Sequence, residues 1–397
     1  MSFIKFAWRR NLIYPIQLLI WTFIRKINAM ILDKEFNYSK SIIFTELMFL
    51  GEFLAGFILN AYQKSFIKKK SNEESKKGQF IYNENTLSRP DSKIKIFFLI
   101  FVASYFDFVE FILSTNYIPK FPKASGSLET RLGGILTISS ALFFYYLLKF
   151  PIFKHQFFSL LIIGIGLIII IISEFLFQDF DIFLSYGDFG QTILLIFFVH
   201  FFNSLLDSSE KYIMEYNNIN YFQILGFEGL FGFLITFAYS FSDDSYLKQL
   251  SSVYSENTGG KFALFIFLLI VYLILCGGRN AYRVVTNKIY SPMTKTLTDY
   301  FLNPMYLIIN YIEGDFVSGG KQNFFYFLIN FIISIFITLC GCIYNEILIL
   351  FFCGLERDTY DQVSFRSNWN YLKDSRKFSM SLEDLDINME ELDDLQD

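Results

Sequence analysis

Histidine and cysteine are scarce in this chain of 397 residues. It contains only His155 and His200, which are too few for a histidine-based metal cluster. Its four cysteines fall in or beside apolar segments, so we expect no disulfide framework. The HExxH, GxSxG, Walker and GxGxxG patterns are absent, which leaves the common hydrolase, metalloprotease and NTPase classes without support. We therefore expect no enzymatic activity, no cofactor and no nucleic-acid partner.

Charge is also sparse. Charged residues make up 18% of the chain, whereas hydrophobic residues make up 53%, including 52 phenylalanines, and the mean hydropathy is +0.38. A soluble domain carries roughly 25% charged residues. The composition predicts an all-α, polytopic membrane protein, with the lipid bilayer as its first partner. The net charge of −4 adds nothing, because it sums basic loops and an acidic tail.

Hydropathy predicts ten transmembrane helices, because about 20 apolar residues cross a bilayer core of ~30 Å. Basic residues precede the first apolar run, as in a signal peptide, but a small-x-small cleavage site is missing, so we expect this helix to be retained. The predicted spans lie near 10–31, 41–63, 95–116, 127–149, 153–176, 189–213, 220–241, 262–284, 293–312 and 323–348.

Loop charges predict the orientation. The polar loop 64–95 is rich in lysine and is expected to be flexible, whereas the loop Phe177–Gly187 carries Asp179 and Asp181 but no lysine or arginine. Cytosolic loops of membrane proteins are enriched in Lys and Arg. Both termini are therefore predicted to be cytosolic.

The chain divides into two five-helix halves, 1–176 and 177–350, followed by an acidic tail, 351–397, that we expect to be disordered. Within the tail, Tyr360 and Val363 frame a four-residue tyrosine-based sorting signal. Together with the family resemblance described below, this favours an endomembrane location: Golgi, endoplasmic reticulum or endolysosome.

Two stretches open alike. Ser127–Lys149 and Ser291–Ile312 both begin Ser-x-x-Thr followed by a basic residue, Arg131 in the first and Lys295 in the second. Five predicted spans separate their starts, so the two helices enter from opposite faces of the membrane. In a carrier built from an inverted repeat, a pair of equivalent helices that enter from opposite faces would line the central binding site.

Polar and charged residues inside the predicted spans are the candidate site, because a charge at mid-bilayer costs roughly 2.5–3.5 kcal/mol on insertion scales. Arg131 and Lys295 would offer positive charge to a phosphate or carboxylate, and a guanidinium suits bidentate binding. Thr130 and Thr294 would add hydroxyl donors. The candidate substrate-binding residues are Glu52, Asp107, Thr130, Arg131, Asn203, Asp207, Glu228, Asn280, Thr294, Lys295 and Asp299.

Structural roles remain open for several charges. Lys295 and Asp299 are four residues apart and could form an ion pair within one helix, as could Asp207 and Lys211. Arg279, Arg283 and Lys288 approach a helix end and could be interfacial anchors, and Glu210 and Lys211 could be interfacial as well. Glu52, Asp107 and Glu228 could pair with the basic groups, or one of them could carry a proton.

These residues resemble those of the drug/metabolite transporter superfamily, and within it solute carrier family 35, subfamily F. The motifs are MFLGEF at 48–53, Asp107, Leu128–Gly133, Glu210-Lys211, EGLFGF at 228–233 and the stretch Asn280–Asp299. The resemblance covers roughly residues 41–350 and implies the EamA-type fold, with ten helices in two inverted halves around a cavity that opens alternately to each side. The first span, with Arg25 and Lys26, departs from the family pattern, and no site residue is assigned to it.

The sequence thus favours a secondary-active transporter of a small anionic or zwitterionic metabolite, such as an exchanger of nucleotide sugars or organophosphates. Two alternatives stand beside it. One is a proton-coupled amino-acid or cation carrier similar to the chloroquine-resistance transporters. The other is a membrane interaction protein with little transport, whose lysine-rich loop and acidic tail bind the partner. The sequence leaves the substrate, the coupling ion and the oligomeric state open.

Overall fold

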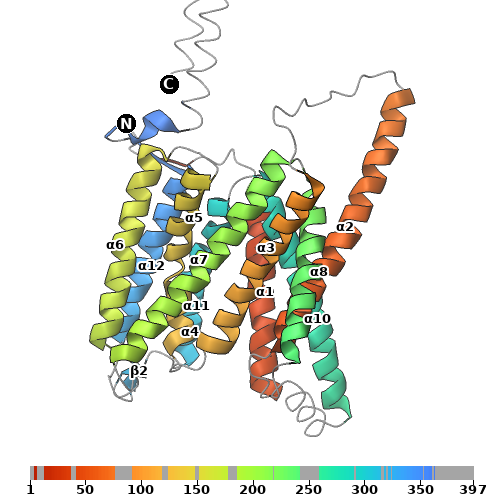
Figure 1. Ribbon diagram of the computed structural model, residues 1–397. Coiled ribbons are helices and arrows are strands. Elements are labelled where there is room, and N and C mark those ends of the chain that lie inside the picture. Colours follow the sequence, from red (N-terminus) through yellow and green to blue (C-terminus); the bar gives the residue numbers. More distant parts are fainter. Residues whose placement is uncertain are drawn as a thin grey trace, which may run out of the picture.

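The computed structural model is a bundle of helices that run alongside one another (Figure 1). It describes residues 4–6, 13–36, 42–76, 92–118, 124–147, 152–177, 186–217, 219–241, 259–289, 292–313, 317–318, 321–322, 324–351, 353–359 and 362. The helices are α1 Ile13–Phe36, α2 Ile42–Lys76, α3 Lys93–Ile112, α4 Ala124–Arg131, α5 Gly134–Leu147, α6 Lys154–Phe177, α7 Tyr186–Tyr216, α8 Tyr221–Ser240, α10 Gly260–Ile289, α11 Pro292–Glu313 and α12 Phe324–Tyr344.

Seven of the described helices are long and apolar enough to cross a membrane: α1, α2, α6, α7, α8, α10 and α12. Large apolar side chains such as Ile58, Ile168 and Phe336 are exposed on the outside of the bundle, as a lipid-facing surface requires. The predicted class, an all-α multi-pass membrane protein, is therefore confirmed.

The other three predicted spans, 95–116, 127–149 and 293–312, are helical but fall outside those seven. They bring charge into the bundle: Asp107 and Glu110 in α3, Arg131 in α4, and Lys295 and Asp299 in α11. Hydropathy predicts an unbroken helix over 127–149, which is wrong. Leu132 and Gly133 interrupt it, and α5 that follows has only 14 residues. The count of ten crossings stays a prediction.

The second helix is longer than expected. α2 continues beyond residue 63 to Lys76, so the first part of the predicted flexible loop 64–95 is helical. Lysine and glutamate dominate this extension, and both are good helix formers. Residues 77–91 lie outside the described residues, as do most of the tail, Tyr360 and Val363; within the described part of the tail, Leu355–Asp358 forms a 3-10 helix.

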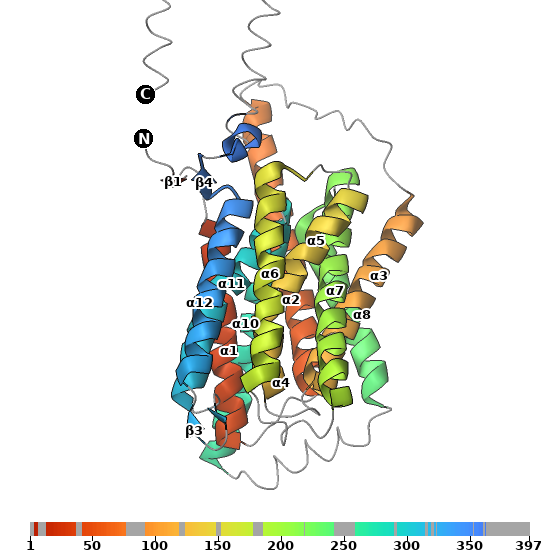
Figure 2. The ribbon, with the colours of Figure 1, turned by 90° about the vertical axis from the view of Figure 1, so that its left-hand side faces the viewer.

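The first described segment pairs with the one that follows the last long helix. Strand β1 (Ile4–Phe6) pairs antiparallel with β4 (Leu348–Leu350), which follows α12 directly. Both strands lie at the same end of the bundle in Figure 2. A second small ladder, β2 (Val317–Ser318) with β3 (Lys321–Gln322), joins α11 to α12. Sequence periodicity predicted none of these short strands.

Glycines let two helices touch through their backbones. A Cβ added at Gly56 of α2 would lie 2.3 Å from the backbone nitrogen of Gly226 in α8. One added at Gly229 of α8 would lie 2.3 Å from the nitrogen of Phe53. Small residues allow such close approach between membrane helices. The MFLGEF and EGLFGF segments therefore pack directly against each other.

The apolar core has two main clusters, which do not follow the two sequence halves. One joins residues of α1, α2, α3 and α10, with side chains of α8 packed against it; Phe49, Phe265 and Tyr272 are examples. The other joins residues of α4, α6, α7, α11 and α12, including Ile163, Ile196 and Ile337. Each cluster draws helices from both halves, and α6 and α12 lie side by side in both views (Figures 1 and 2).

Candidate functional site

A cavity of about 400 Å³ lies among α1, α2, α3, α4, α7, α10 and α11. Nine charged side chains line it, which is unusual for the inside of an apolar bundle. Five are basic and four are acidic: Arg25, Lys26, Arg279, Arg283 and Lys295, and Asp107, Glu110, Glu129 and Asp299.

The structure divides the eleven predicted site residues into three groups. Five line the cavity: Asp107, Thr130, Asn203, Lys295 and Asp299. Four lie in the polar network next to the cavity: Glu52, Asp207, Glu228 and Asn280. Two lie apart from the cavity: Arg131 and Thr294.

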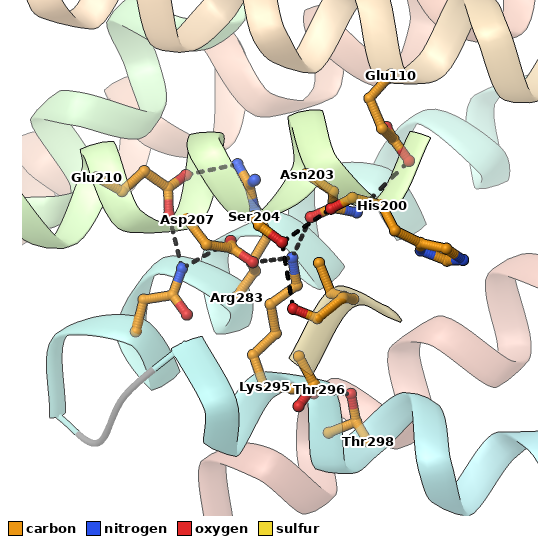
Figure 3. A network of polar contacts seen from close by, with 12 residues as sticks. Glu110, His200, Asn203, Ser204, Asp207, Glu210, Arg283, Lys295, Thr296 and Thr298 are labelled. Atoms are coloured by element: carbon orange, nitrogen blue, oxygen red, sulfur yellow. Dashed lines mark hydrogen bonds and ion pairs between the residues drawn. The ribbon is translucent and has the colours of Figure 1, made fainter. Parts of the chain in front are cut away.

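Lys295 links two helices at the cavity wall (Figure 3). Its Nζ donates to Asp207 Oδ2 at 2.7 Å and to Asn203 Oδ1 at 2.8 Å. The amide of Asn203 in turn donates to Glu110 at 3.5 Å. Lys295 of α11 therefore pairs with Asp207 of α7. The alternative, an ion pair between Lys295 and Asp299 within α11, does not form.

Lys211 does not pair with Asp207 either. Its Nζ lies 2.9 Å from Glu215 Oε1 and 3.0 Å from the carbonyl oxygen of Lys288. Lys211 therefore joins the end of α7 to the end of α10, and Asp207 is left for Lys295.

Arg283 is the centre of a second group of charges. Its Nη2 lies 2.9 Å from Glu210 Oε1, 3.6 Å from Glu228 Oε2 and 3.8 Å from Glu52 Oε1. The Arg283 side chain is 2% exposed. The interpretation of Arg283 as an interfacial anchor and of Glu210 as an interfacial residue is therefore wrong, because both are buried and face each other.

Two asparagines of α10 complete this group. Asn280 donates to Glu52 Oε1. Asn287 donates to Glu210 Oε2 at 2.7 Å and to Asp207 Oδ1 at 3.1 Å, and so connects the Arg283 group to the Lys295 group. We call the combined set the ionic layer: Glu52, Asp207, Glu210, Glu228, Asn280, Arg283, Asn287 and Lys295.

The ionic layer lies toward one end of the cavity. The residues that line the cavity reach Asn203 on α7 and Arg283 on α10, whereas the layer extends further along these helices, to Glu210 and Asn287. Both helices end soon after these residues, and α11 begins there with Lys295 in its first turns. The layer therefore separates the cavity from this end of the bundle.

Arg131 makes a separate polar cluster. Its Nη1 donates to Glu174 Oε2 at 2.7 Å, to the hydroxyl oxygen of Tyr326 at 2.7 Å and to Asn330 Oδ1 at 3.1 Å. It is 4% exposed and does not line the cavity. Thr294 donates to Asn345 Oδ1 at 2.8 Å. The predicted pairing of Arg131 with Lys295 in one anion site is wrong, because Arg131 faces α6 and α12.

Two arginines of the lining were not assigned to the site from sequence. Arg25 lies halfway along the 24 residues of α1, and Arg279 lies on α10 one turn before Arg283. No carboxylate lies within ion-pair distance of either guanidinium in the part of the chain that the structure describes. A charge in mid-helix is itself the signal that identifies them.

Comparison with known proteins gives no match, either to a protein-family model or to a curated sequence. The resemblance to solute carrier family 35 therefore rests on the motifs alone. Over the described ranges, no group of three His, Cys, Asp or Glu side chains is placed to hold a metal ion. His200 lines the cavity, and its Nε2 lies 3.2 Å from the carbonyl oxygen of Glu129.

Proposed function

We propose that the protein is a secondary-active transporter that carries a small anionic or zwitterionic metabolite across a membrane by alternating access. The observation that carries this proposal is the charged cavity inside an apolar, membrane-spanning bundle. Its volume of about 400 Å³ falls within the range of roughly 300–1,000 Å³ that is typical of small-molecule sites.

The cost of the charges supports a role in binding. Each ion taken from water into a protein interior costs several kcal/mol, and a well-packed apolar replacement is often as stable or more stable. Packing alone therefore gives no reason for nine charged groups to surround one cavity. A polar solute that must pass through the membrane gives such a reason.

The packing of the helices supports two inverted five-helix repeats. Let α1, α2, α3, α5 and α6 correspond in order to α7, α8, α10, α11 and α12. The main helix contacts then fall into equivalent pairs. α1 packs against α10 as α7 packs against α3, and α2 packs against α10 as α8 packs against α3. The contact of α5 with α7 corresponds to that of α11 with α1, and the pairs α2–α8 and α6–α12 correspond to themselves. A two-fold axis in the membrane plane would produce this pattern.

In this proposal the ionic layer is the closed gate on the cytosolic side. The lysine-rich loop supports a cytosolic location for the ends of α2, α7 and α10, and the layer lies between those ends and the cavity. To release substrate there, the contacts of Arg283 with Glu210 and of Lys295 with Asp207 must separate. We place the carrier in an endomembrane on the sequence features alone.

Proton coupling is a second candidate mechanism for the same carrier. One guanidinium, Arg283, faces three carboxyl groups, those of Glu52, Glu210 and Glu228. One positive charge does not neutralise three negative charges. Three carboxyl groups that all lie within 4.0 Å of the same guanidinium nitrogen do not all ionise together. A proton held in this group could move with the substrate.

Counterflow into proteoliposomes tests the proposal. Purified full-length protein is reconstituted, preloaded with unlabelled solute and offered labelled nucleotide sugars, organophosphates, amino acids or organic cations, each with and without a pH gradient. We expect saturable uptake of at least one anion or zwitterion, and loss of that uptake in Arg279→Gln. Glu215→Gln, which removes an exposed charge at the end of α7, serves as the control and should retain it. No uptake from folded protein would contradict the proposal.

A further inference from the structure

We infer that the cavity has two poles of opposite charge and binds an amphoteric substrate, with its acid group between Arg25 and Arg279 and its ammonium group beside Asp107 and Glu110. This inference rests on the proposed function, because it names the class of solute that the carrier would take.

The basic pole lies between α1 and α10. Arg25 and Arg279 both line the cavity, and the helices that carry them, α1 and α10, pack against each other. Arg279 donates to Asn280 Oδ1 at 2.6 Å, and its Nε has no hydrogen-bond partner. Two neighbouring guanidinium groups without a carboxylate partner within ion-pair distance are suited to a bidentate anion such as a carboxylate or phosphate.

The acidic pole lies on α3, with α4 beside it. Asp107 and Glu110 are three residues apart on one face of α3, and both line the cavity. Asp107 is 6% exposed, and its Oδ2 has no hydrogen-bond partner. Glu110 accepts a hydrogen bond from the neutral amide of Asn203 at 3.5 Å. This pole lacks a cation at ion-pair distance among the described residues.

Lys295, the lysine of the ionic layer, does not supply this cation. Lys295 uses its ammonium group on Asp207 and Asn203, each within 2.8 Å. An ammonium group of the substrate would instead meet the free carboxylate oxygen of Asp107. An acid group without an ammonium would satisfy only the basic pole and would be repelled by α3, and a polycation would be repelled by Arg25 and Arg279.

Matched probes separate these cases. The thermal stability of the purified full-length protein is measured with ω-amino acids of increasing chain length, and with dicarboxylates and diamines of the same lengths. We expect one ω-amino acid to stabilise saturably, with a Kd at least about tenfold lower than those of the dicarboxylate and the diamine of equal length.

The poles are then tested one at a time. Arg279→Gln should shift the preference toward the diamine, and Asp107→Asn should shift it toward the dicarboxylate. If Asp107→Asn does not fold, Glu110→Gln tests the same pole. Glu215→Gln, outside the cavity, should leave the preference unchanged. A dicarboxylate or diamine preferred by the unaltered protein, or equal losses for all three probe classes in both variants, would overturn the two-pole site.

Counterflow of the same probes separates this inference from the proposed function. Saturable stabilisation by an ω-amino acid with no counterflow of any solute supports the site and contradicts the carrier. Counterflow of another solute with no response to any ω-amino acid supports the carrier and overturns the amphoteric substrate. If the protein shows neither, both are contradicted.

Discussion

At the scale of single residues, the stability of the ionic layer depends on Arg283. It is the only basic side chain within 4.0 Å of Glu52, Glu210 or Glu228 among the described residues. All four side chains are buried, and breaking a buried ion pair by removing one partner is costly because the other charge is left uncompensated.

Arg283→Ala should therefore lower stability by about 3–5 kcal/mol, measured as a large drop in the thermal midpoint of the detergent-solubilised protein. Lys288→Ala, five residues further along α10 and partly exposed, removes the same charge at little cost. Equal midpoints for the two variants would contradict the central position of Arg283.

Arg131 should act on stability through Glu174. Arg131→Ala and Glu174→Ala should each destabilise the protein, and the double variant should be less destabilised than the sum of the two, with a coupling of about 0.5–3 kcal/mol. A double-mutant cycle on the thermal midpoint measures this. If Arg131→Ala leaves the midpoint unchanged but abolishes counterflow, Arg131 is a substrate ligand and does not stabilise the bundle through Glu174.

The sequence predicts which residues are costly inside the membrane, but not their partners. Asp107, Lys295 and Asp299 were identified by their depth in apolar runs, and they line the cavity. Arg131 met the same criterion, yet its partner Glu174 is 43 residues away and lies on another helix, which no local pattern reveals. Arg25 lay inside the predicted span 10–31 but was left out because that span departs from the family pattern; the structure places it halfway along α1.

At the scale of elements, the joint between α2 and α8 holds one side of the bundle together. Its glycines bring the two backbones into contact, and Gly229 is the tightest position on α8 together with Gly232, where an added Cβ would lie 2.2 Å from the ring of Phe49. Such a contact leaves no room for a methyl group unless the helices separate.

Gly229→Ala should lower the thermal midpoint, since overpacking a well-packed contact costs typically about 1–3 kcal/mol. Gly164→Ala on α6 is the matched control: its added Cβ comes no nearer than 3.9 Å to Ile138, and alanine favours the helix. A Gly229→Ala protein as stable as the Gly164→Ala protein would mean that α2 and α8 are not in backbone contact.

Helix existence was predictable from hydropathy, whereas helix continuity was not. Every predicted span contains a helix whose ends lie within a few residues of the predicted boundaries, apart from α1, the extended α2 and the interrupted fourth span. The break at Leu132 and Gly133 lies between Arg131 and the apolar run that begins at Ile135, and hydropathy, which averages over a window, does not mark it. The pairing of β1 with β4 joins segments at opposite ends of the sequence and is likewise invisible to local patterns.

At the scale of the whole molecule, the chain is a membrane-spanning bundle with a charged cavity in its interior, closed toward the end of α7 and α10 by the ionic layer. The proposed transport depends on this arrangement and not on the tail. The activity of a partner-binding protein would instead depend on the tail and not on the cavity.

Truncation after Asp358 should therefore leave counterflow unchanged, because none of the residues that line the cavity or form the ionic layer lies beyond residue 306. The assay is the same counterflow in proteoliposomes, with the full chain as the control. Loss of all activity in a folded truncated protein would favour the interaction-protein alternative.

Transport by alternating access requires that the cavity be reached from each side of the membrane in turn, and accessibility to a thiol reagent measures this. In a Cys353→Ser background, which removes the exposed cysteine of the described chain, Thr130→Cys places a thiol in the cavity and Thr294→Cys places one in a buried position outside it. A membrane-impermeant reagent is applied to each face in turn. Alternating access predicts that Thr130→Cys is labelled from both faces and Thr294→Cys from neither. Labelling of Thr130→Cys from one face only, in protein with and without transported solute, would contradict alternating access.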